Sequence, residues 1–301
     1  MSEPMSEAGR ASARREERDL LGAVAVLGAG VMGRGIGAHL CRFAERVTLY
    51  EPDLSRAEEG HAAALNSLER AQSRGKISAE EAGEAGRRLA VSDEVSRAVE
   101  GCALVIEAAP ERLELKQALL LEAESALAPS ALLASNTSSL SISRLAAGLT
   151  RPERFLGMHF FNPVPVMQLL ELVHGERTGA DTLEEARALA AQIDKVPIVV
   201  RDSPGFATSR LGIALGNEAA RMLAEGVASA EDIDRAMVLG YRHPIGPLAL
   251  GDLVGLDTRL AISEYLYKEL GSEVFNPPQM IRDLVAAGSL GRKSGRGFYE
   301  Y

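Results

Sequence analysis

The chain has little cysteine and no long apolar run. Its 301 residues include only two cysteines, Cys41 and Cys102, which is too few for a disulfide framework and typical of a reducing compartment. No stretch is apolar over the length of a membrane span, and the first 20 residues lack the apolar segment of a signal peptide. We therefore expect a cytoplasmic protein with no membrane partner, in which residues 1–20 form a mobile tail.

The chain also lacks an excess of basic residues. Lys and Arg number 33 against 42 Asp and Glu, which gives a net charge of −9. Nucleic acids and anionic membranes bind to basic surfaces, so neither is expected as a partner, whereas a few local cations suffice for a small polyanionic ligand. The rest of the composition is that of an ordinary globular protein, with 46% hydrophobic residues and a length that allows two domains.

The most informative motif is a glycine-rich turn. Gly28, Gly30 and Gly33 form Gly-x-Gly-x-x-Gly directly after the apolar run 23–27 and before a helical stretch. Glycines in this context permit a tight turn, the approach of a pyrophosphate and close packing of helix on strand. Glu51 ends the next apolar run about 20 residues further on, where a carboxylate accepts the ribose 2′-OH of NAD and repels the 2′-phosphate of NADP. We predict an NAD site here; the alternative is an ordinary glycine turn beside an acidic surface residue.

Residues 22–200 alternate short apolar strands with amphipathic helical stretches, which is the pattern of an α/β, doubly wound parallel sheet. The expected strands lie at 23–28, 46–51, 103–107, 131–135, 154–160, 167–173 and 196–200. The expected helices lie near 31–43, 53–73, 111–127 and 181–194. The connection between 160 and 167 is too short for a helical crossover, so the strands on either side of it should pair antiparallel. Residues 75–102 show no clear pattern.

A Pro-Gly turn at 204–205 interrupts this alternation, and only helical stretches are expected beyond it. They lie near 206–226, 229–239, 246–270 and 277–288. We predict a Rossmann-like NAD-binding domain at 21–201 and an all-helical substrate and dimerisation domain at 202–301. The apolar content of the second domain is high for its size, which favours a homodimer.

Polar residues at the carboxyl ends of the expected strands are the candidates for chemistry, because ligands bind there in such sheets. The sequence places Glu107, the hydroxyl-rich segment 135–139 and His159 at three of these ends. An imidazole is suited to remove the proton of an alcohol as hydride leaves its carbon. A hairpin would set Glu171 roughly opposite His159, where a carboxylate could fix the tautomer of the ring. The alternative is a core histidine and an edge-strand glutamate that are each satisfied by backbone groups.

Four longer motifs resemble those of the 3-hydroxyacyl-CoA dehydrogenase family and occur in the family's order over about residues 22–301. They are SNTSSL at 135–140, GMHFFNPVPVM at 157–167, DSPGF at 202–206 and GRKSGRGFY at 291–299. The resemblance implies a Rossmann-like domain followed by a helical one. It also implies the reversible, NAD-dependent oxidation of an L-3-hydroxyacyl-CoA to a 3-ketoacyl-CoA, with an acyl-CoA thioester as the bound partner.

The resemblance also assigns roles to residues. His159 matches the catalytic base, Glu171 the carboxylate that orients it, and Ser138 the serine that hydrogen-bonds the reacting oxygen. Ser209 stands where the family has an asparagine that contacts the substrate; we include it among the catalytic residues and expect it to alter the activity or the acyl group accepted, because a hydroxyl offers fewer hydrogen bonds than an amide. The predicted cofactor-binding residues are Gly28, Gly30, Met32, Gly33, Glu51, Glu111, Lys116, Asn136, Asn162 and Lys293.

Other interpretations fit parts of the sequence. A dehydrogenase of a free 3-hydroxy acid, as in carnitine- and gulonate-type relatives, would keep the fold, but the SNTSSL and GMHFFNPVPVM motifs speak against it. A hydroxyisobutyrate-type dehydrogenase needs a lysine early in the helix from 206, and 206–220 contains none. A non-catalytic NAD-binding homologue is favoured by Ser209 alone. No metal site is expected, since His174 lacks a third ligand nearby, and we expect His39 on a helix surface.

Overall fold

The computed structural model describes residues 20–301, and these form two compact units. The first unit ends at Asp202 and the second begins at Ser203. The segment 1–20, for which we predict a mobile tail, lies outside the described residues except for Leu20. Within the described part, no helix is both long and apolar enough to cross a membrane.

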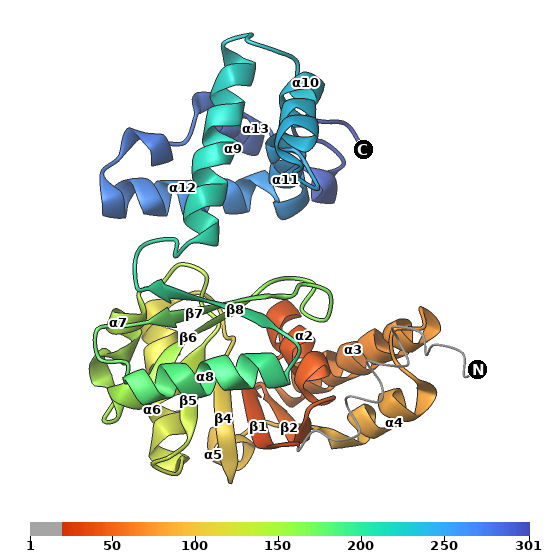
Figure 1. Cartoon of the computed structure of the whole chain (residues 1–301), viewed down its shortest axis with the longest axis vertical. Coiled ribbons are helices and arrows are strands. Elements are labelled where there is room, and N and C mark those ends of the chain that lie inside the picture. The colour runs from red at the N-terminus through yellow and green to blue at the C-terminus, as the bar shows by residue number, and fades with distance from the viewer. Residues whose placement is uncertain (1–19) are drawn as a thin grey trace, which may run out of the picture. The chain divides into compact units, whose positions relative to one another are not determined.

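The first unit is built on one sheet of eight strands (Figure 1). The strands are β1 (Leu21–Leu27), β2 (Ala44–Tyr50), β3 (Leu89–Ser92), β4 (Cys102–Glu107), β5 (Leu132–Ser135), β6 (Phe155–Phe160), β7 (Leu169–His174) and β8 (Val196–Arg201). Their order in space is β3-β2-β1-β4-β5-β6-β7-β8, and all neighbours run parallel except β6 and β7. The predicted α/β, Rossmann-like fold and the antiparallel β6–β7 pair are therefore confirmed.

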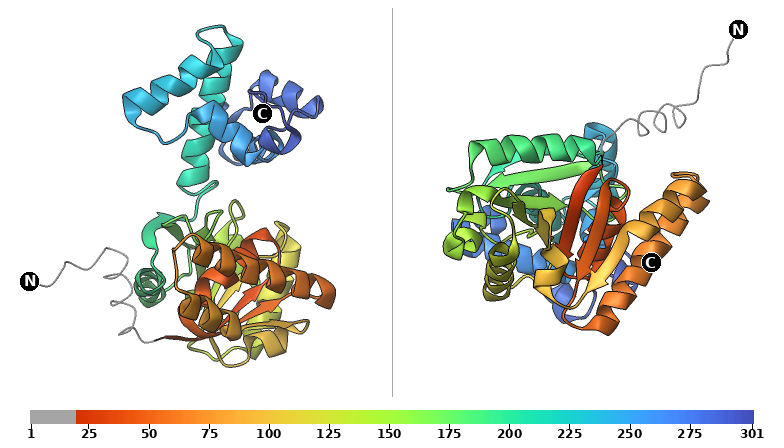
Figure 2. Two further views of the ribbon diagram at one scale, coloured as in Figure 1. Left: turned by 90° about the vertical axis from the view of Figure 1, so that its right-hand side faces the viewer. Right: turned by 90° about the horizontal axis from the view of Figure 1, so that it is seen from below.

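Helices cover both faces of this sheet, because alternate strand residues are apolar on each face. The helices of the first unit are α2 (Val31–Leu40), α3 (Leu54–Ser73), α4 (Ala79–Arg88), α5 (Val95–Val99), α6 (Leu113–Ala126), α7 (Ile142–Leu145) and α8 (Ala180–Gln192). One core joins α2, α3, α4 and α8 to the sheet, with α8 on β6, β7 and β8. α5 and α6 contact the strands β1, β2 and β4, and the view from below in Figure 2 shows α6 and α8 on opposite sides of the sheet.

The structure fills the segment 75–102 with α4, β3 and α5. β3 was not predicted because its four residues are too few to show an alternating pattern. The start of α4 does carry a local signal: Ser78 accepts a hydrogen bond from the backbone N–H of Glu81, and the Glu81 side chain accepts one from Ser78 in return. This capping box marks the helix N-terminus.

His39 is not on a helix surface, which corrects the expectation for this residue. It lies in α2 with only 2% of its surface exposed, and its Nε2 is 2.7 Å from the carbonyl oxygen of Ile193. The ring packs into the layer between α2 and the end of α8, a contact 154 residues apart in sequence that no local pattern indicates.

The second unit is helical. Its helices are α9 (Thr208–Ala224), α10 (Ala230–Arg235), the π-helical turn η3 (Ala236–Gly240), α11 (Pro247–Val254), α12 (Leu256–Leu270) and α13 (Gln279–Ala286). The single helix expected at 246–270 is divided at Gly255, whose φ of 103° is open to glycine but strained for other residues. The C-terminal segment is held by the buried Asp252, which accepts hydrogen bonds from the backbone N–H groups of Phe298 and Tyr299.

Candidate active site

The glycine-rich turn joins β1 to α2, and its three glycines have different surroundings. A Cβ on Gly28 would come within 2.7 Å of the Ala108 carbonyl oxygen, and a Cβ on Gly33 within 1.7 Å of the Gly28 oxygen. A Cβ on Gly30 would meet nothing within 4 Å. Gly28 and Gly33 are thus required by packing, whereas the space beside Gly30, at the N-terminus of α2, suits the pyrophosphate of a dinucleotide.

Glu51 follows β2 directly and is largely buried. Its Oε2 accepts a hydrogen bond from the backbone N–H of Ala29 at 3.3 Å, so the carboxylate is held against the glycine-rich turn. The exposed Arg56 places its Nη1 3.4 Å from Oε1 of the same carboxylate. This position fits a carboxylate that binds ribose hydroxyls. The pairing of Glu51 with the Arg56 cation was not predicted from the sequence.

A cavity of about 310 Å³ lies in the first unit at the carboxyl ends of the sheet strands. Residues from the ends of β4, β5 and β6 line it, which is where ligands bind in doubly wound sheets. The lining residues are Met32, Ala108, Ala109, Glu111, Lys116, Asn136, Ser138, His159, Phe160, Phe161 and Asn162. The structure therefore brings seven of the predicted site residues to one cavity.

His159 and Glu171 face each other across the antiparallel β6–β7 pair. They are directly opposite in register, and the His159 Nδ1 lies 2.6 Å from the Glu171 Oε2. Glu171 is fully buried and His159 nearly so. With Nδ1–H donating to the carboxylate, the neutral ring carries its lone pair on Nε2, the arrangement of a general base with an orienting partner.

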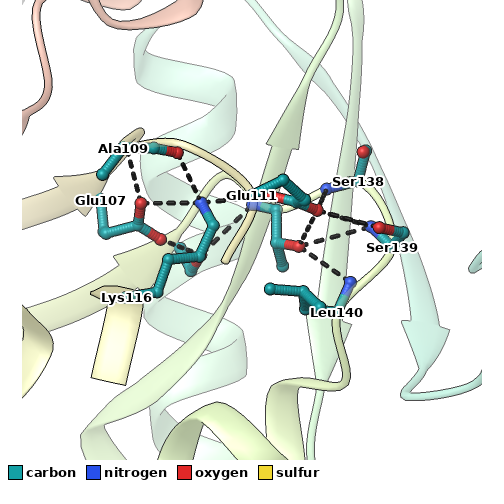
Figure 3. Close-up of polar contacts among 9 residues, drawn as sticks. Glu107, Ala109, Glu111, Lys116, Ser138, Ser139 and Leu140 are labelled. Carbon is teal, nitrogen blue, oxygen red and sulfur yellow. Dashed lines mark hydrogen bonds and ion pairs between the residues drawn. The ribbon is translucent and has the colours of Figure 1, made fainter. Parts of the chain in front are cut away.

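Glu111 organises the turn that carries Ser138. Its Oε1 accepts hydrogen bonds from the Thr137 hydroxyl at 2.5 Å and from the backbone N–H groups of Ser138 and Ser139 at 3.1 Å and 3.2 Å (Figure 3). Desolvation alone would raise the pKa of Glu111, but the nearby Lys116 and the hydrogen bonds from Thr137 and Ser139 lower it overall. The turn is therefore built around an ionised carboxylate.

Glu107 is the site residue whose role the sequence did not assign. It ends β4, is fully buried, and its Oε1 lies 2.7 Å from the Lys116 Nζ. Burial raises the pKa of Glu107 above its ordinary value, even with the Lys116 ammonium beside it. Its place as an acid at a strand end was visible in the sequence; its lysine partner nine residues later, on α6, was not.

Two asparagines line the same cavity. The Asn136 Oδ1 accepts a hydrogen bond from the Phe160 N–H at 2.8 Å and so ties the end of β5 to the end of β6. Asn162 follows β6, and Phe161 stacks a tilted ring on His159 with centroids 4.4 Å apart. Asn136 and Asn162 therefore line the cavity that also holds the imidazole, and the Phe161 ring packs against that imidazole.

Two predicted site residues lie in the second unit. Ser209 is in the first turn of α9 and half-buried. The Lys293 Nζ is 2.6 Å and 2.7 Å from the two carboxylate oxygens of Asp257, and this hydrogen bond lowers the pKa of Asp257. Lys293 is thus held by Asp257 at the start of α12.

Comparisons with known proteins agree over most of the described residues. The family model for the 3-hydroxyacyl-CoA dehydrogenase NAD-binding domain matches residues 23–203, and that for the C-terminal domain matches 205–301. A probable 3-hydroxybutyryl-CoA dehydrogenase of Bacillus subtilis is 41% identical over 278 residues, which cover 92% of this chain and 96% of that protein. A 3-hydroxybutyryl-CoA dehydrogenase of Bradyrhizobium diazoefficiens is 42% identical over 279 residues, covering 92% and 94%. The crystal structure of (S)-3-hydroxybutyryl-CoA dehydrogenase from Ralstonia eutropha superposes with a TM-score of 0.87 at 42% identity, covering 93% and 98%.

Proposed function

The chain belongs to the 3-hydroxyacyl-CoA dehydrogenase family, and from this premise we propose that it interconverts an L-3-hydroxyacyl-CoA and the 3-ketoacyl-CoA. The enzyme is an NAD-dependent dehydrogenase, and its first domain is the NAD-binding one. We propose that residues 21–201 bind the cofactor and that residues 202–301 bind the substrate and form the dimer.

The contact between His159 and Glu171 at the cavity is the observation that carries the proposal. In the oxidation, the His159 Nε2 takes the proton of the substrate hydroxyl. Glu171 holds the ring by Nδ1 and stabilises the imidazolium that forms. NAD, when bound at the glycine-rich turn, would supply the hydride acceptor for the carbon that bears this hydroxyl. In the reverse direction, the imidazolium of His159 would return its proton to the carbonyl oxygen.

The remaining site residues bind the substrate or the cofactor in this reaction. Ser138 donates a hydrogen bond to the reacting oxygen, and Ser209 contacts the substrate in place of the asparagine usual in the family. Gly28, Gly30 and Gly33 support the pyrophosphate, and Glu51 binds the adenosine ribose. The other proposed members of the cofactor site are Met32, Glu111, Lys116, Asn136, Asn162 and Lys293.

The proposal includes a coenzyme A thioester as substrate, since two relatives are named 3-hydroxybutyryl-CoA dehydrogenases and match over almost their full length. It also includes a homodimer formed through the helical domain, and a cytoplasmic location as expected from composition. A free 3-hydroxy acid is the competing substrate class.

One assay separates the substrate classes. NADH consumption is followed with acetoacetyl-CoA, longer 3-ketoacyl-CoA thioesters and the matching free keto acids, side by side. We expect turnover of the thioesters only. His159→Gln and Glu171→Gln should each lower kcat by about 10²- to 10⁴-fold, because the first removes the base and the second removes the carboxylate that fixes its tautomer and stabilises its charge. NADH affinity, measured by fluorescence, should be unchanged in both variants. Turnover of the free acids alone, or wild-type rates in either variant, would refute the assignment.

A further inference from the structure

Lys195 is a buried lysine in the turn between α8 and β8. It is 5% exposed, and its Nζ donates hydrogen bonds to the carbonyl oxygens of Val164 at 2.6 Å and Met167 at 2.7 Å. Both acceptors belong to the connection between β6 and β7, residues 161–168, and lie 31 and 28 positions earlier in the chain. One ammonium group thus joins two points of this connection.

The backbone around Lys195 brings the same turn to the connection. Asp194 has a φ of 55°, in the left-handed region that few non-glycine residues adopt. The Lys195 N–H then donates to the Ala190 carbonyl oxygen at 2.8 Å, which closes the end of α8. The next N–H, of Val196, donates to the Gln168 carbonyl oxygen at 2.8 Å. The turn therefore holds the connection both by its backbone and by the Lys195 side chain.

The connection carries a cavity residue at its beginning. Asn162 lines the cavity, and the Pro163 carbonyl oxygen after it accepts the N–H groups of Val166 and Met167 at 2.9 Å and 3.0 Å. Val164 is buried, whereas Val166 is 69% and Met167 39% exposed. The outer half of the connection is therefore largely in solvent. Lys195 bonds it at the buried Val164, two residues after Asn162, and again at Met167.

The positive charge of Lys195 is unfavourable in this place. Burial, and after it the nearby Arg42, lowers the pKa of Lys195 to about 8, although Asp194 acts in the opposite direction. At neutral pH the ammonium is still protonated, so the folded protein holds a cation that the unfolded chain would hold more easily. An apolar side chain of similar length would avoid this cost, but it could not donate to either carbonyl oxygen. Stability alone therefore does not account for a lysine at this position.

We propose that Lys195 is a positioning residue, which holds the β6–β7 connection by two of its carbonyl oxygens and thereby fixes Asn162 at the cavity. The inference rests on the proposed function, in which Asn162 belongs to the cofactor site, and it deepens that function. Lys195 itself contacts neither cofactor nor substrate in this scheme. It acts through the backbone that follows Asn162.

The test is a double-mutant cycle on the full-length protein, with Lys195→Met, Asn162→Ala and the double variant. Arg151→Met is the matched control. The Nη2 of Arg151 also donates to two carbonyl oxygens, of Glu124 at 2.6 Å and Leu127 at 3.3 Å, but Arg151 precedes β6 and the cavity lies at the other end of that strand. For each protein, kcat/KM for NADH is measured with acetoacetyl-CoA, NADH affinity by fluorescence, and amide hydrogen exchange in the peptide 161–168.

Lys195→Met and Asn162→Ala should each lower kcat/KM for NADH by about tenfold, because either change removes a correctly placed contact to the cofactor. The double variant should also lose about tenfold and not about 100-fold, since two changes that act through one group are not additive. The amides of Val166 and Met167 should exchange faster in Lys195→Met. Arg151→Met should keep the wild-type kcat/KM and the wild-type exchange rates in this peptide.

A double variant that lost about 100-fold would overturn the proposal, because Lys195 would then act independently of Asn162. Wild-type kcat/KM, or unchanged exchange of the connection, in Lys195→Met would overturn it as well. If the methionine variant does not fold, Lys195→Gln, which keeps a polar but shorter side chain, takes its place in the cycle. A wild-type enzyme that reduced no thioester would refute the proposed function separately. NADH affinity would then replace kcat/KM in the same cycle, and the same outcomes would decide on Lys195.

Discussion

The rings of two buried histidines in the first unit, His159 and His39, have different hydrogen-bond partners. The His159 Nδ1 meets the carboxylate of Glu171, so a proton taken up by that ring is balanced by a negative charge. The His39 Nε2 meets the Ile193 carbonyl oxygen, while its Nδ1 is buried without a hydrogen-bond partner among the described residues. Surroundings and not residue type therefore decide which imidazole can serve as a base.

The contrast predicts a pH effect on stability from His39. Burial, and after it the nearby Lys195, lowers the pKa of His39 to about 3. The unfolded chain then binds a proton below about pH 6.5 that the folded chain does not, so stability is complete above pH 6.5 and is lost as the pH falls towards 3. Between pH 7 and pH 5 the loss amounts to about 2 kcal/mol.

The check is urea unfolding at pH 7 and pH 5 for the wild type and His39→Gln, whose amide can still donate to Ile193. The variant should lose about 2 kcal/mol less of its unfolding free energy between the two pH values than the wild type does. Equal losses in both proteins would show that His39 titrates normally.

Glu51 is expected to determine the preference for NADH over NADPH. Arg56 is paired with Glu51, so removing the carboxylate leaves an exposed guanidinium beside the ribose site. Glu51→Ala should raise kcat/KM with NADPH relative to NADH by about tenfold or more, since it removes a repulsion and releases a cation for the 2′-phosphate. Adding Arg56→Ala should cancel most of that gain. A preference unchanged by Glu51→Ala would remove Glu51 from the ribose site.

The length of the apolar pattern decided which helices and strands could be predicted from the sequence. Strands with several alternating or continuous apolar residues were located to within about two residues, and the β6–β7 pair followed from the short connection between them. β3 was missed because it is four residues long, and the break at Gly255 because a glycine within an apolar helical pattern has no single meaning.

The site residues that could be predicted from the sequence also had a recognisable pattern. His159, Glu171 and Ser138 stand at strand ends or in motifs, so topology and resemblance together located them. The Glu107–Lys116 contact could not be predicted, because it depends on how α6 packs against β4 and not on any spacing along the chain. The pairing of Arg56 with Glu51 is of the same kind.

The turn from β1 to α2 yields a prediction from two glycines of one element. Gly33→Ala should lower the unfolding free energy by about 1–3 kcal/mol, because its Cβ would overlap the Gly28 carbonyl oxygen and the backbone must move. Gly30→Ala should change it by less than about 1 kcal/mol, as nothing lies within 4 Å of the new methyl group.

The same two variants also test where NADH binds. Gly30→Ala should weaken NADH at least about tenfold, since the methyl group takes space needed by the pyrophosphate. Fluorescence titration and thermal unfolding of both variants provide the measurement. A stable Gly30→Ala variant with wild-type NADH affinity would place the pyrophosphate elsewhere.

The exposure of large apolar side chains is uneven between the two units. Eight large apolar side chains are exposed in the second unit, and eight in the described part of the first, which is nearly twice as long. The most exposed of all are Tyr241 at 76%, Leu239 at 72% and Leu211 at 71%, all in the helical unit. Contiguous apolar exposure is typical of surfaces that a partner covers, and Leu239 and Tyr241 lie two residues apart in the chain.

The last prediction is that these side chains are covered by a second copy of the chain. Light scattering should give the wild type twice the mass of its 32.0 kDa chain, because an isologous contact through the helical unit would bury both copies of each apolar residue. Leu239→Asp and Tyr241→Asp should shift the protein to monomer at micromolar concentration, since a buried unpaired carboxylate opposes association. Leu54→Asp, at an exposed apolar position in the first unit, should remain dimeric. A monomeric wild type, or dissociation by Leu54→Asp alone, would show that a second copy does not cover these side chains.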